Sequence, residues 1–425
     1  GRVRVSVGSA DRTFSTLEIF TASGTTDSAL GAALAAGDFD NDGRDELAIG
    51  APRMEVSGAS DAGAVLIITF TEGGGWSSQE LSQDDTAWST PENGDWFGAA
   101  LVVGNFNGDL YDDLAVATPY EDWDSTDNGC VQVYYGTASG LGIAGSQGFA
   151  AGYGGVAGPA TGTDRMGHAM AVGDFNDDAC DDLAVAAPFR DLGGVEDAGQ
   201  VHVLYGDPAG ITTDGDLLLS QGDFQGSATQ AGNMFGHALA AGLFDEATWT
   251  CLSSDCFADL AIGVPGQQVG TTLRAGKLMV LYSDADGVET SGYLSLTAAQ
   301  AGSPVEQDAA FGHSLAAGHS DPSFFSQADV VVGAPWEDGA VLDEGRDSVL
   351  QGFTIGWGVA EYGAGIRLED ASPTISYCIV SNNQSRLDGA GIDVYGGTPE
   401  FTNCVISDNR AFGATSIGAG ISLYG

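Results

Sequence analysis

One phrase recurs five times along the chain and constrains its fold more than any other feature. Each copy opens on a large apolar residue followed by Gly, passes through small residues into an acidic loop, and closes on a triplet such as Gly-Ala-Pro. The copies begin at Leu30, Phe97, Met166, Phe235 and Phe311, at intervals of 67, 69, 69 and 76 residues. This period is longer than that of leucine-rich and helical solenoid repeats. It leaves room for four strands per copy.

The pattern within one copy favours strands over helices. The stretch before the acidic loop, the stretch after it (DLAVAA in the third copy) and a third stretch such as GQVHVLYG are short and bounded by turn residues. Gly (65 residues) far exceeds Pro (12), which is typical of many short strands joined by tight turns. These features predict an all-β fold in which each copy forms one blade of a β-propeller.

These residues form the FG-GAP pattern, and over roughly residues 1–340 the chain resembles the propeller of integrin α subunits and its bacterial relatives. The resemblance implies an FG-GAP β-propeller. Propellers of this family usually have seven blades, whereas about five are visible here. The N-terminal GRVRVSVGS aligns with the third strands of the repeats, and the fifth copy ends soon after Trp336. We therefore expect the first residues to complete the last blade and close the ring.

The charge balance restricts the partners of the chain. There are 59 acidic and 13 basic residues, which gives a formal net charge of -46. Such a chain repels nucleic acid and anionic membrane surfaces and attracts cations. A solvated acidic surface without bound ions is the alternative interpretation. No apolar run approaches the ~18 residues of a membrane helix, so no membrane span is expected.

The acidic loop of the first copy has the spacing of a calcium loop. Oxygen ligands stand at loop positions 1, 3, 5, 7 and 9: Asp38, Asp40, Asp42, the backbone carbonyl of Arg44, and Glu46. Hard oxygen ligands at alternate residues around a tight turn at Gly43 suit the flexible shell of Ca²⁺ better than that of Mg²⁺. The resemblance implies the same ion, because these loops bind calcium in the integrin-type family. The alternative is that Asp and Asn serve only as turn formers.

Two further loops carry related ligand sets. In the third copy they are Asp174, Asn176, Asp178, the carbonyl of Cys180, and Asp182; in the second they are Asn105, Asn107, Asp109, the carbonyl of Tyr111, and Asp113. The position of Gly43 is taken by Ala179 in the third loop and by Leu110 in the second, which also has one charge fewer. Calcium affinity is therefore expected to fall in the order first, third, second. We expect two or three calcium sites, with a structural role.

Other metal sites are not expected. The fourth acidic loop begins with Leu243 and carries an insertion, and the fifth offers His319 and Ser320, so neither preserves the calcium ligands. Three copies carry a His at one repeat position: His168, His237 and His313. No carboxylate recurs beside these residues, which favours backbone hydrogen bonding over zinc binding.

The six Cys residues suggest an oxidising compartment. Cys251 and Cys256 lie within the insertion of the fourth copy, where a disulfide would staple the loop. Cys130 and Cys180 are expected to be free thiols, because strand alternation places them at opposite ends of their blades. Cys378 aligns with Cys404, as a disulfide or as stacked thiols.

The loops after the repeated phrase also carry candidate binding residues. We expect Tyr120, Glu121, Phe189 and Arg190, among others, to be exposed there. Such residues are either solvated or contact a protein ligand.

Beyond about Val341 the period shortens. Units that open on GAGI begin at Gly363, Gly389 and Gly418, 26 and 29 residues apart. One unit of this length cannot bury a core alone, but stacked coils of a parallel β-helix do so. Residues 341–425 resemble the right-handed β-helix repeats of bacterial surface proteins and polysaccharide lyases. They are predicted to form the start of such a helix.

Together these patterns favour a secreted or cell-surface protein, bacterial by resemblance. We expect a calcium-binding adhesion module, or one that binds a protein or carbohydrate ligand. We expect no enzymatic activity, because the chain shows no Ser/His/Asp arrangement, nucleophile elbow or phosphate loop. Two alternatives remain open: a structural spacer of a long surface protein, and a non-catalytic part of a secreted enzyme of the polysaccharide lyase or phospholipase type.

Overall fold

The computed structural model describes residues 3–8, 14–20, 28–71, 75–85, 88–123, 125–225, 227–244, 257–301, 305–318 and 328–335, and twelve short strands between residues 350 and 424. Strands make up almost all of the regular structure. Within the described residues the exceptions are two 3₁₀ helices, η1 (Gln83–Asp85) and η2 (Gln221–Asp223). The predicted all-β fold is confirmed.

The chain divides into two compact units. The first consists of Gly1–Val7, Thr16–Ile262 and Val280–Leu294, and the second of Gly8–Ser15, Gly263–Met279 and Ser295–Gly425. The predicted domain boundary between residues 340 and 341 falls outside the described residues and stays a prediction.

Each of the first four repeats forms one four-stranded sheet. The strands of the first repeat are β3 (Leu34–Gly37), β4 (Glu46–Ala51), β5 (Ala64–Phe70) and β6 (Trp76–Leu81). Those of the second are β7 (Ala100–Gly104), β8 (Asp113–Thr118), β9 (Cys130–Tyr135) and β10 (Gly142–Phe149). Those of the third are β11 (Ala169–Gly173), β12 (Asp182–Ala187), β13 (Gln200–Tyr205) and β14 (Thr212–Leu219). Those of the fourth are β15 (Leu239–Gly242), β16 (Asp259–Val264), β17 (Lys277–Leu281) and β20 (Leu294–Leu296), with a short hairpin of β18 (Ser283–Asp284) and β19 (Gly287–Val288).

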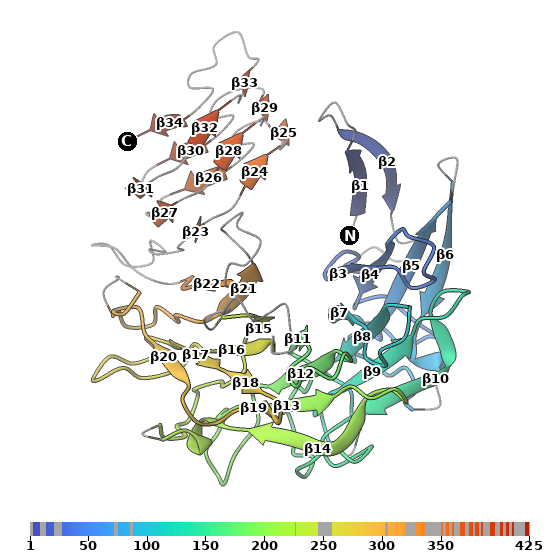
Figure 1. Ribbon diagram of the computed structural model, residues 1–425, viewed down its shortest axis with the longest axis horizontal. Helices are drawn as coiled ribbons and strands as arrows, with labels where there is room; N and C mark the ends of the chain where they lie inside the picture. The colour runs from blue at the N-terminus through green and yellow to red at the C-terminus, as the bar shows by residue number, and fades with distance from the viewer. Residues whose placement is uncertain are drawn as a thin grey trace. The chain divides into compact units, whose positions relative to one another are not determined.

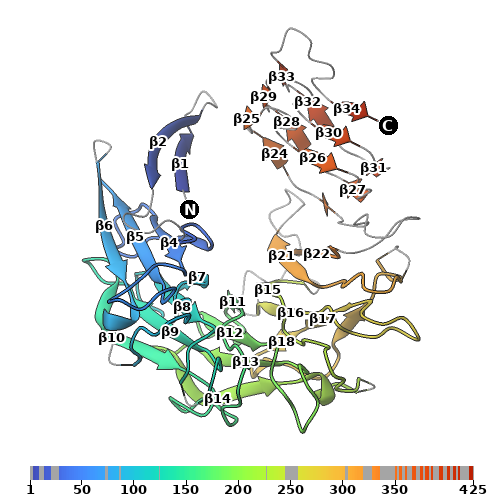
Figure 2. The same ribbon diagram turned by 180° about the vertical axis from the view of Figure 1, so that it is seen from behind.

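The first strands of successive sheets, β3, β7, β11 and β15, lie beside one another (Figures 1 and 2). The second strands β8, β12 and β16 are buried along their whole length. A strand covered on both faces needs apolar side chains on both, which explains continuous runs such as LAVAA in place of an alternating pattern. The acidic loops all join a first strand to a second strand, so they lie at equivalent ends of adjacent sheets.

Successive repeats meet through close backbone contacts at glycines with positive φ. Gly199, just before β13, has a φ of +83°, and a Cβ placed there would lie 2.3 Å from the backbone N and O of Phe235. Phe235 in turn donates its N–H to the carbonyl of Ala198 at 3.1 Å. The same contact joins Gly63 to Phe97 and Gly129 to Met166. Only Gly has both the required φ and the missing side chain, so this residue sets the distance between neighbouring blades.

The N-terminal strand takes the third-strand position of a further blade. β1 (Val3–Gly8) pairs with β2 (Phe14–Phe20) in a two-stranded sheet. Val3 is buried, and its Cγ2 lies where a Cβ on Gly31 would clash, as Val65 does at Gly98. The fifth repeat contributes a separate two-stranded sheet of β21 (Ser314–Gly318) and β22 (Asp329–Gly333). The predicted alignment of the N-terminus with third strands is thus supported, but the predicted ring closure is not confirmed.

The C-terminal strands form a parallel β-helix of three coils. The first coil contains β23 (Leu350–Gln351), β24 (Thr354–Gly356), β25 (Val359–Ala360) and β26 (Ile366–Glu369). The second contains β27 (Thr374–Ser376), β28 (Ile379–Ser381), β29 (Gln384–Ser385) and β30 (Ile392–Tyr395), and the third β31 (Glu400–Thr402), β32 (Val405–Ser407), β33 (Arg410–Ala411) and β34 (Ile421–Tyr424). Corresponding strands pair in parallel, with Ile366, Ile392 and Ile421 in one register. The predicted coil period is confirmed.

The contact between repeats predicts a large difference between two glycine substitutions. Gly199→Ala should destabilise the fold by about 1 kcal/mol for its positive φ and by a further 1–3 kcal/mol for overpacking against Phe235. Gly194→Ala is the matched control, because Gly194 has a φ of +87° with no atom within 4 Å of a Cβ. It should cost only about 1 kcal/mol. Urea unfolding measures both, and equal costs would contradict this account of the blade contact.

Candidate metal sites

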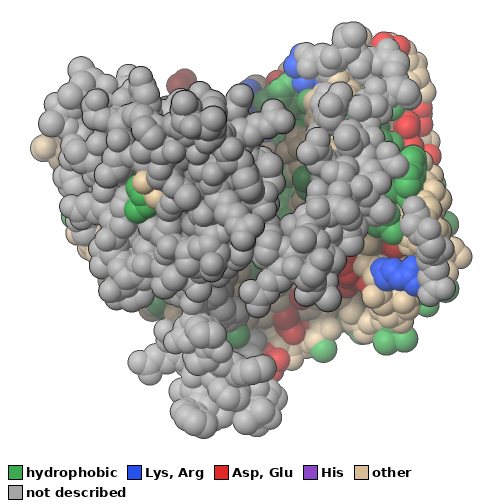
Figure 3. All heavy atoms as spheres, turned by 90° about the horizontal axis from the view of Figure 1, so that it is seen from above, with side chains coloured by type: hydrophobic (Ala, Val, Ile, Leu, Met, Phe, Trp, Pro, Cys, Tyr) green, Lys and Arg blue, Asp and Glu red, His purple; other side chains and the backbone are tan. Residues whose placement is uncertain are grey.

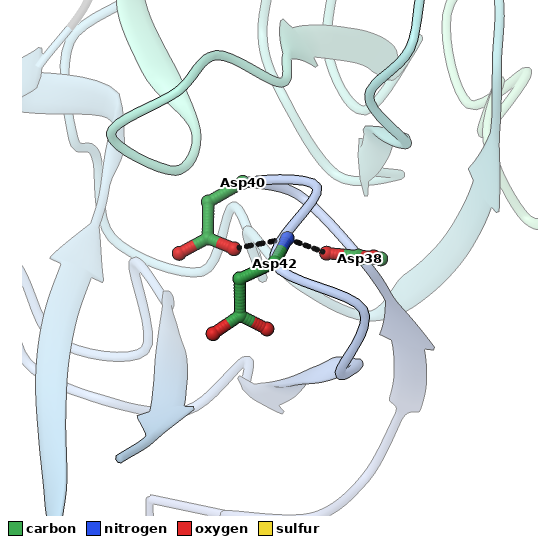
Figure 4. Close-up of side chains that lie close together, drawn as sticks. All are labelled: Asp38, Asp40 and Asp42. Atoms are coloured by element: carbon green, nitrogen blue, oxygen red, sulfur yellow. Dashed lines mark hydrogen bonds between the residues drawn. The ribbon is translucent and has the colours of Figure 1, made fainter. Parts of the chain in front are cut away.

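The first acidic loop, between β3 and β4, brings three carboxylates together. The side-chain oxygens of Asp38, Asp40 and Asp42 lie within 4.8 Å of one another (Figure 4). The backbone N–H of Asp42 donates to Oδ1 of Asp38 at 3.0 Å and to Oδ1 of Asp40 at 3.1 Å, and Gly43 donates to Oδ2 of Asp38 at 2.9 Å. Gly43 has a φ of +87°, which turns its N–H toward Asp38. The loop therefore gathers three like charges, two of them bonded to its backbone, an arrangement that a bound cation would stabilise.

The third acidic loop, between β11 and β12, repeats this geometry. The N–H of Asp178 donates to Oδ1 of Asp174 at 3.2 Å and to Oδ1 of Asn176 at 3.1 Å. Ala179 donates to Oδ2 of Asp174 at 3.1 Å and has a φ of +71°. The loop keeps the backbone shape that Gly43 gives to the first loop. It does so with an Ala in a conformation that disfavours a Cβ.

The second acidic loop, between β7 and β8, differs in its hydrogen bonds. Asp109 donates its N–H to Oδ1 of Asn105 and of Asn107. The side-chain amide of Asn105 also donates to the carbonyl of Asp109 at 2.8 Å, a bond that a carboxylate cannot make. The amide of Asn107 donates to Asp109 Oδ2 at 3.0 Å, as Asn176 does to Asp178 in the third loop. Leu110 is 76% exposed and is not among the described residues with positive φ. The weaker calcium affinity of the second loop stays a prediction.

The carboxylates at position 9 of the loops, which are predicted calcium ligands, also accept hydrogen bonds from backbone N–H groups. Phe106 donates its N–H to Oδ2 of Asp113 at 2.8 Å, and Gly136, which follows the third strand, donates to Oδ1 at 2.9 Å. Asp182 accepts the equivalent pair of bonds, and Glu46 accepts one from Phe39 at 2.9 Å. All three side chains are buried. Each oxygen keeps a second lone pair, so these bonds leave room for a metal bond.

The same anchor recurs at Asp259. It stands at the equivalent position of the fourth repeat, whose loop sequence lacks the predicted calcium ligands. Its Oδ2 accepts the N–H of Phe244 at 2.7 Å, and its Oδ1 accepts that of Ser283 at 3.0 Å. The position-9 residue therefore anchors the loop to its own blade. The sequence hinted at this, since DLAV-type strands open on an acid even in the fourth repeat.

Burial changes the protonation of these anchors. Burial raises the pKa of Asp113, of Asp182 and of Glu46 to about 7 in each case, against the lowering effect of the backbone N–H donors. The neighbouring loop carboxylates raise the pKa values further by repulsion. A cation bound nearby would favour the charged forms.

At position 7 the predicted contribution is a backbone carbonyl. The N–H of Tyr111 donates to Oδ1 of Asp109 at 2.7 Å, and the N–H of Cys180 donates to Oδ1 of Asp178 at 2.8 Å. These bonds fix the turn that carries the carbonyls. The carbonyls of Arg44, Tyr111 and Cys180 stay predicted ligands.

Two further carboxylates, which the sequence analysis missed, tie neighbouring loops together. Asp112 Oδ2 accepts the N–H of Asp38 at 2.9 Å, and Asp181 Oδ2 accepts the N–H of Asn105 at 2.8 Å. Both stand at loop position 8, where Asp also occurs as Asp45 in the first loop. This recurrence was visible in the sequence, but its partner lies a whole repeat away.

Two of the three repeat His residues lie close together. The rings of His168 and His237 lie 5.0 Å apart, and His168 packs edge-on against Phe189 at 5.4 Å. Across the described residues, the one group of three or more His, Cys, Asp or Glu side chains that is arranged for a metal is that of the first loop. Cys130 and Cys180 are free and buried, as predicted. Cys251, Cys256, Cys378, Cys404, His319 and Ser320 lie outside the described residues.

The prediction that Glu121 and Arg190 are exposed was wrong. Arg190 is 3% exposed and pairs with the buried Asp164, and Glu121 is 5% exposed and accepts a hydrogen bond from the side chain of Gln83. Burial raises the pKa of Glu121 to about 8. The reason is the neighbouring blade, which covers the base of these loops. Tyr120 and Phe189 are half-buried, and the guanidinium of Arg165 lies over both rings at 4.8 and 4.6 Å.

Family models match two parts of the chain. The FG-GAP repeat matches residues 30–68, 97–134 and 166–204, and the right handed beta helix region matches residues 323–425. The three matched FG-GAP copies are those with acidic loops of the predicted calcium type.

Curated relatives match the repeats over part of their length. Integrin alpha-8 of Mus musculus is 32% identical over 193 residues, 44% of this chain and 16% of the relative. Phosphatidylinositol-glycan-specific phospholipase D of Rattus norvegicus is 30% identical over 214 residues, 49% of this chain and 24% of the relative. Integrin alpha-PS2 of Drosophila melanogaster is 28% identical over 261 residues, 60% of this chain and 16% of the relative. The chain thus spans less than a quarter of these relatives. It is an all-β protein with FG-GAP repeats similar to those of integrin alpha chains, followed by a right-handed β-helix region.

Proposed function

We propose that the chain is an extracellular calcium-binding module that acts in adhesion or binds a protein or carbohydrate ligand. The observation that carries the calcium assignment is the group of three carboxylates in the first loop, whose oxygens lie within 4.8 Å of one another. Backbone N–H groups of the loop donate to Asp38 and Asp40. These are hard oxygen donors in a loop with a tight turn, which fits Ca²⁺. The ion would neutralise the cluster and fix the loop between β3 and β4, so its role is structural.

The partner of the module is proposed from the surface and from the relatives. Acidic side chains (red) are spread over the described part of the face in Figure 3, and the net charge of -46 disfavours nucleic acid. The half-buried aromatic residues around Arg165 offer a contact surface for a protein or carbohydrate. Similarity to integrin alpha chains supports a secreted or cell-surface location. No helix in the described residues is long and apolar enough to cross a membrane.

We further propose that the chain itself is not an enzyme. Similarity to a phospholipase D over 24% of that relative supports the alternative that such repeats accompany a catalytic domain elsewhere in a longer protein. Hydrolysis of a phospholipid or a polysaccharide by the purified chain would contradict the proposal. Ligand binding without turnover would support it over the spacer alternative.

Calcium is expected to stabilise the fold. Each occupied site should add about 2.7 kcal/mol to the free energy of unfolding when free calcium is a hundredfold above the dissociation constant. Thermal unfolding with calcium and with chelator, beside a calorimetric titration, measures both the shift and the number of sites. Asp42→Asn should abolish the tightest site, because it removes the charge of one of the three clustered carboxylates. Asp45→Asn, which changes an exposed acid of the same loop, should retain it. If the unaltered chain shows neither a heat of calcium binding nor a thermal shift with calcium, the acidic loops serve only as turns.

Gly43 and Ala179 occupy the same loop position, where φ is positive. Exchanging Gly and Ala there should therefore have opposite effects on the first and third sites. Gly43→Ala should weaken the first site and cost about 1 kcal/mol of stability, because a Cβ there has open space but an unfavourable φ of +87°. Ala179→Gly should relieve the same strain in the third loop and tighten its site. Calcium titrations of both variants test this, and a tighter first site in Gly43→Ala would refute it.

Stability without calcium should fall as the pH rises from about 4.5 to 8. Burial raises the pKa of Glu121 to about 8 and that of Asp95 to about 6, so the folded chain binds protons in this window that the unfolded chain has released. Glu121→Gln should flatten the decline by up to about 1.4 kcal/mol per pH unit. Glu80→Gln, at an exposed position, should leave the decline unchanged. Urea unfolding in chelator across this pH range gives the slopes, and a stability that rises with pH would contradict the assignment.

A further inference from the structure

One residue of the second repeat, Asp112, makes two hydrogen bonds to the backbone of the first calcium loop. Oδ2 of Asp112 accepts the N–H of Asp38 at 2.9 Å, and the N–H of Asp112 donates to the carbonyl of Asp38 at 3.2 Å. Asp38 is the first predicted ligand of its loop. Both of its backbone hydrogen-bonding groups are therefore fixed by one residue 74 positions later in the chain.

The same two-point contact recurs one repeat further along. Asp181 accepts the N–H of Asn105 at 2.8 Å and donates its own N–H to the carbonyl of Asn105 at 2.8 Å. Asp181 is half-buried, so its carboxylate is partly withdrawn from water. At the third loop, Ala258 keeps the backbone bond to the carbonyl of Asp174 at 2.8 Å, but it has no carboxylate to offer. The full contact thus serves the first and second loops.

The glycine that ends each first strand lies against the next repeat. A Cβ on Gly37 would lie 2.6 Å from Cγ1 of Val103 and 3.1 Å from Oδ2 of Asp112. One on Gly104 would lie 2.5 Å from Cγ1 of Val172 and 3.2 Å from Oδ2 of Asp181. The valine is the tighter constraint at both positions, and the acid of the next repeat shares the same space.

We propose that Asp112 is a positioning residue that couples calcium binding in the first loop to the contact between the first and second repeats. By holding the backbone of Asp38, it sets the direction in which the Asp38 carboxylate leaves the chain toward the ion. Coupling of this kind is reciprocal, so calcium in the first loop strengthens the contact to the second repeat. Asp181 does the same for the second loop. This inference rests on the proposed calcium function.

The test compares calcium affinity in variants of the full chain that carry Asp178→Ala. This change disables the third loop, so that the heat of the first loop is read against the weak second loop alone. Asp112→Ala should weaken that site about tenfold or more, the loss expected for one hydrogen bond to a charged acceptor. Asp112→Asn should retain most of the affinity, because its side-chain oxygen still accepts the N–H of Asp38. If Asp112 only supported the fold, restoring its acceptor oxygen in Asp112→Asn would not restore the calcium affinity that Asp112→Ala loses. Calorimetry at a temperature where every variant is folded gives the values.

Two further variants separate the contact from general electrostatics. Asp45→Ala removes the same charge at the same loop position, but in the first loop itself and at an exposed site. It should weaken the first site much less than Asp112→Ala. Asp181→Ala should leave the first site unchanged. Equal losses in Asp45→Ala and Asp112→Ala would overturn the coupling while leaving the calcium function in place. A parent chain without any calcium heat would instead overturn the proposed function.

Discussion

The close approach of backbone between successive repeats is the constraint on which the rest of the structure depends. Glycines with positive φ, such as Gly129 and Gly199, let the chain of the next repeat pass within a distance that any side chain would block. The first strands β3, β7, β11 and β15 are thereby brought side by side. Their acidic loops then come within hydrogen-bonding distance of one another. A looser contact would leave each loop to fold alone, without the bonds from Asp112 and Asp181.

Much of this arrangement follows from the repeated phrase. The period, the order of strands and the loop positions could be predicted because each is local to one repeat, and Ala179 was singled out because Gly43 marked the left-handed position. The β-helix followed from its shorter period in the same way. What one repeat cannot show is the influence of the next. Glu121 and Arg190 looked like surface residues, yet the neighbouring blade buries them.

The candidate site shows the same limit at atomic scale. Alternate oxygens predicted calcium loops, and the first loop does gather Asp38, Asp40 and Asp42. The spacing of Asp113 and Asp182 gave no sign that both of their oxygens also accept backbone N–H groups, because one donor follows the third strand, more than twenty residues away. Side chains that serve both the loop and the blade are visible only once the sheet is assembled.

The carboxylate at loop position 9 has two roles in the first three repeats: it holds the loop to its blade, and it is a predicted ion ligand. In the fourth repeat only the first role remains. Asp259 holds its loop to its blade although the remaining ligands are gone. Loss of the predicted ligands is therefore compatible with retention of a blade. If the loops bind calcium as proposed, a protein of this design can change its number of ion sites loop by loop while its number of sheets stays fixed.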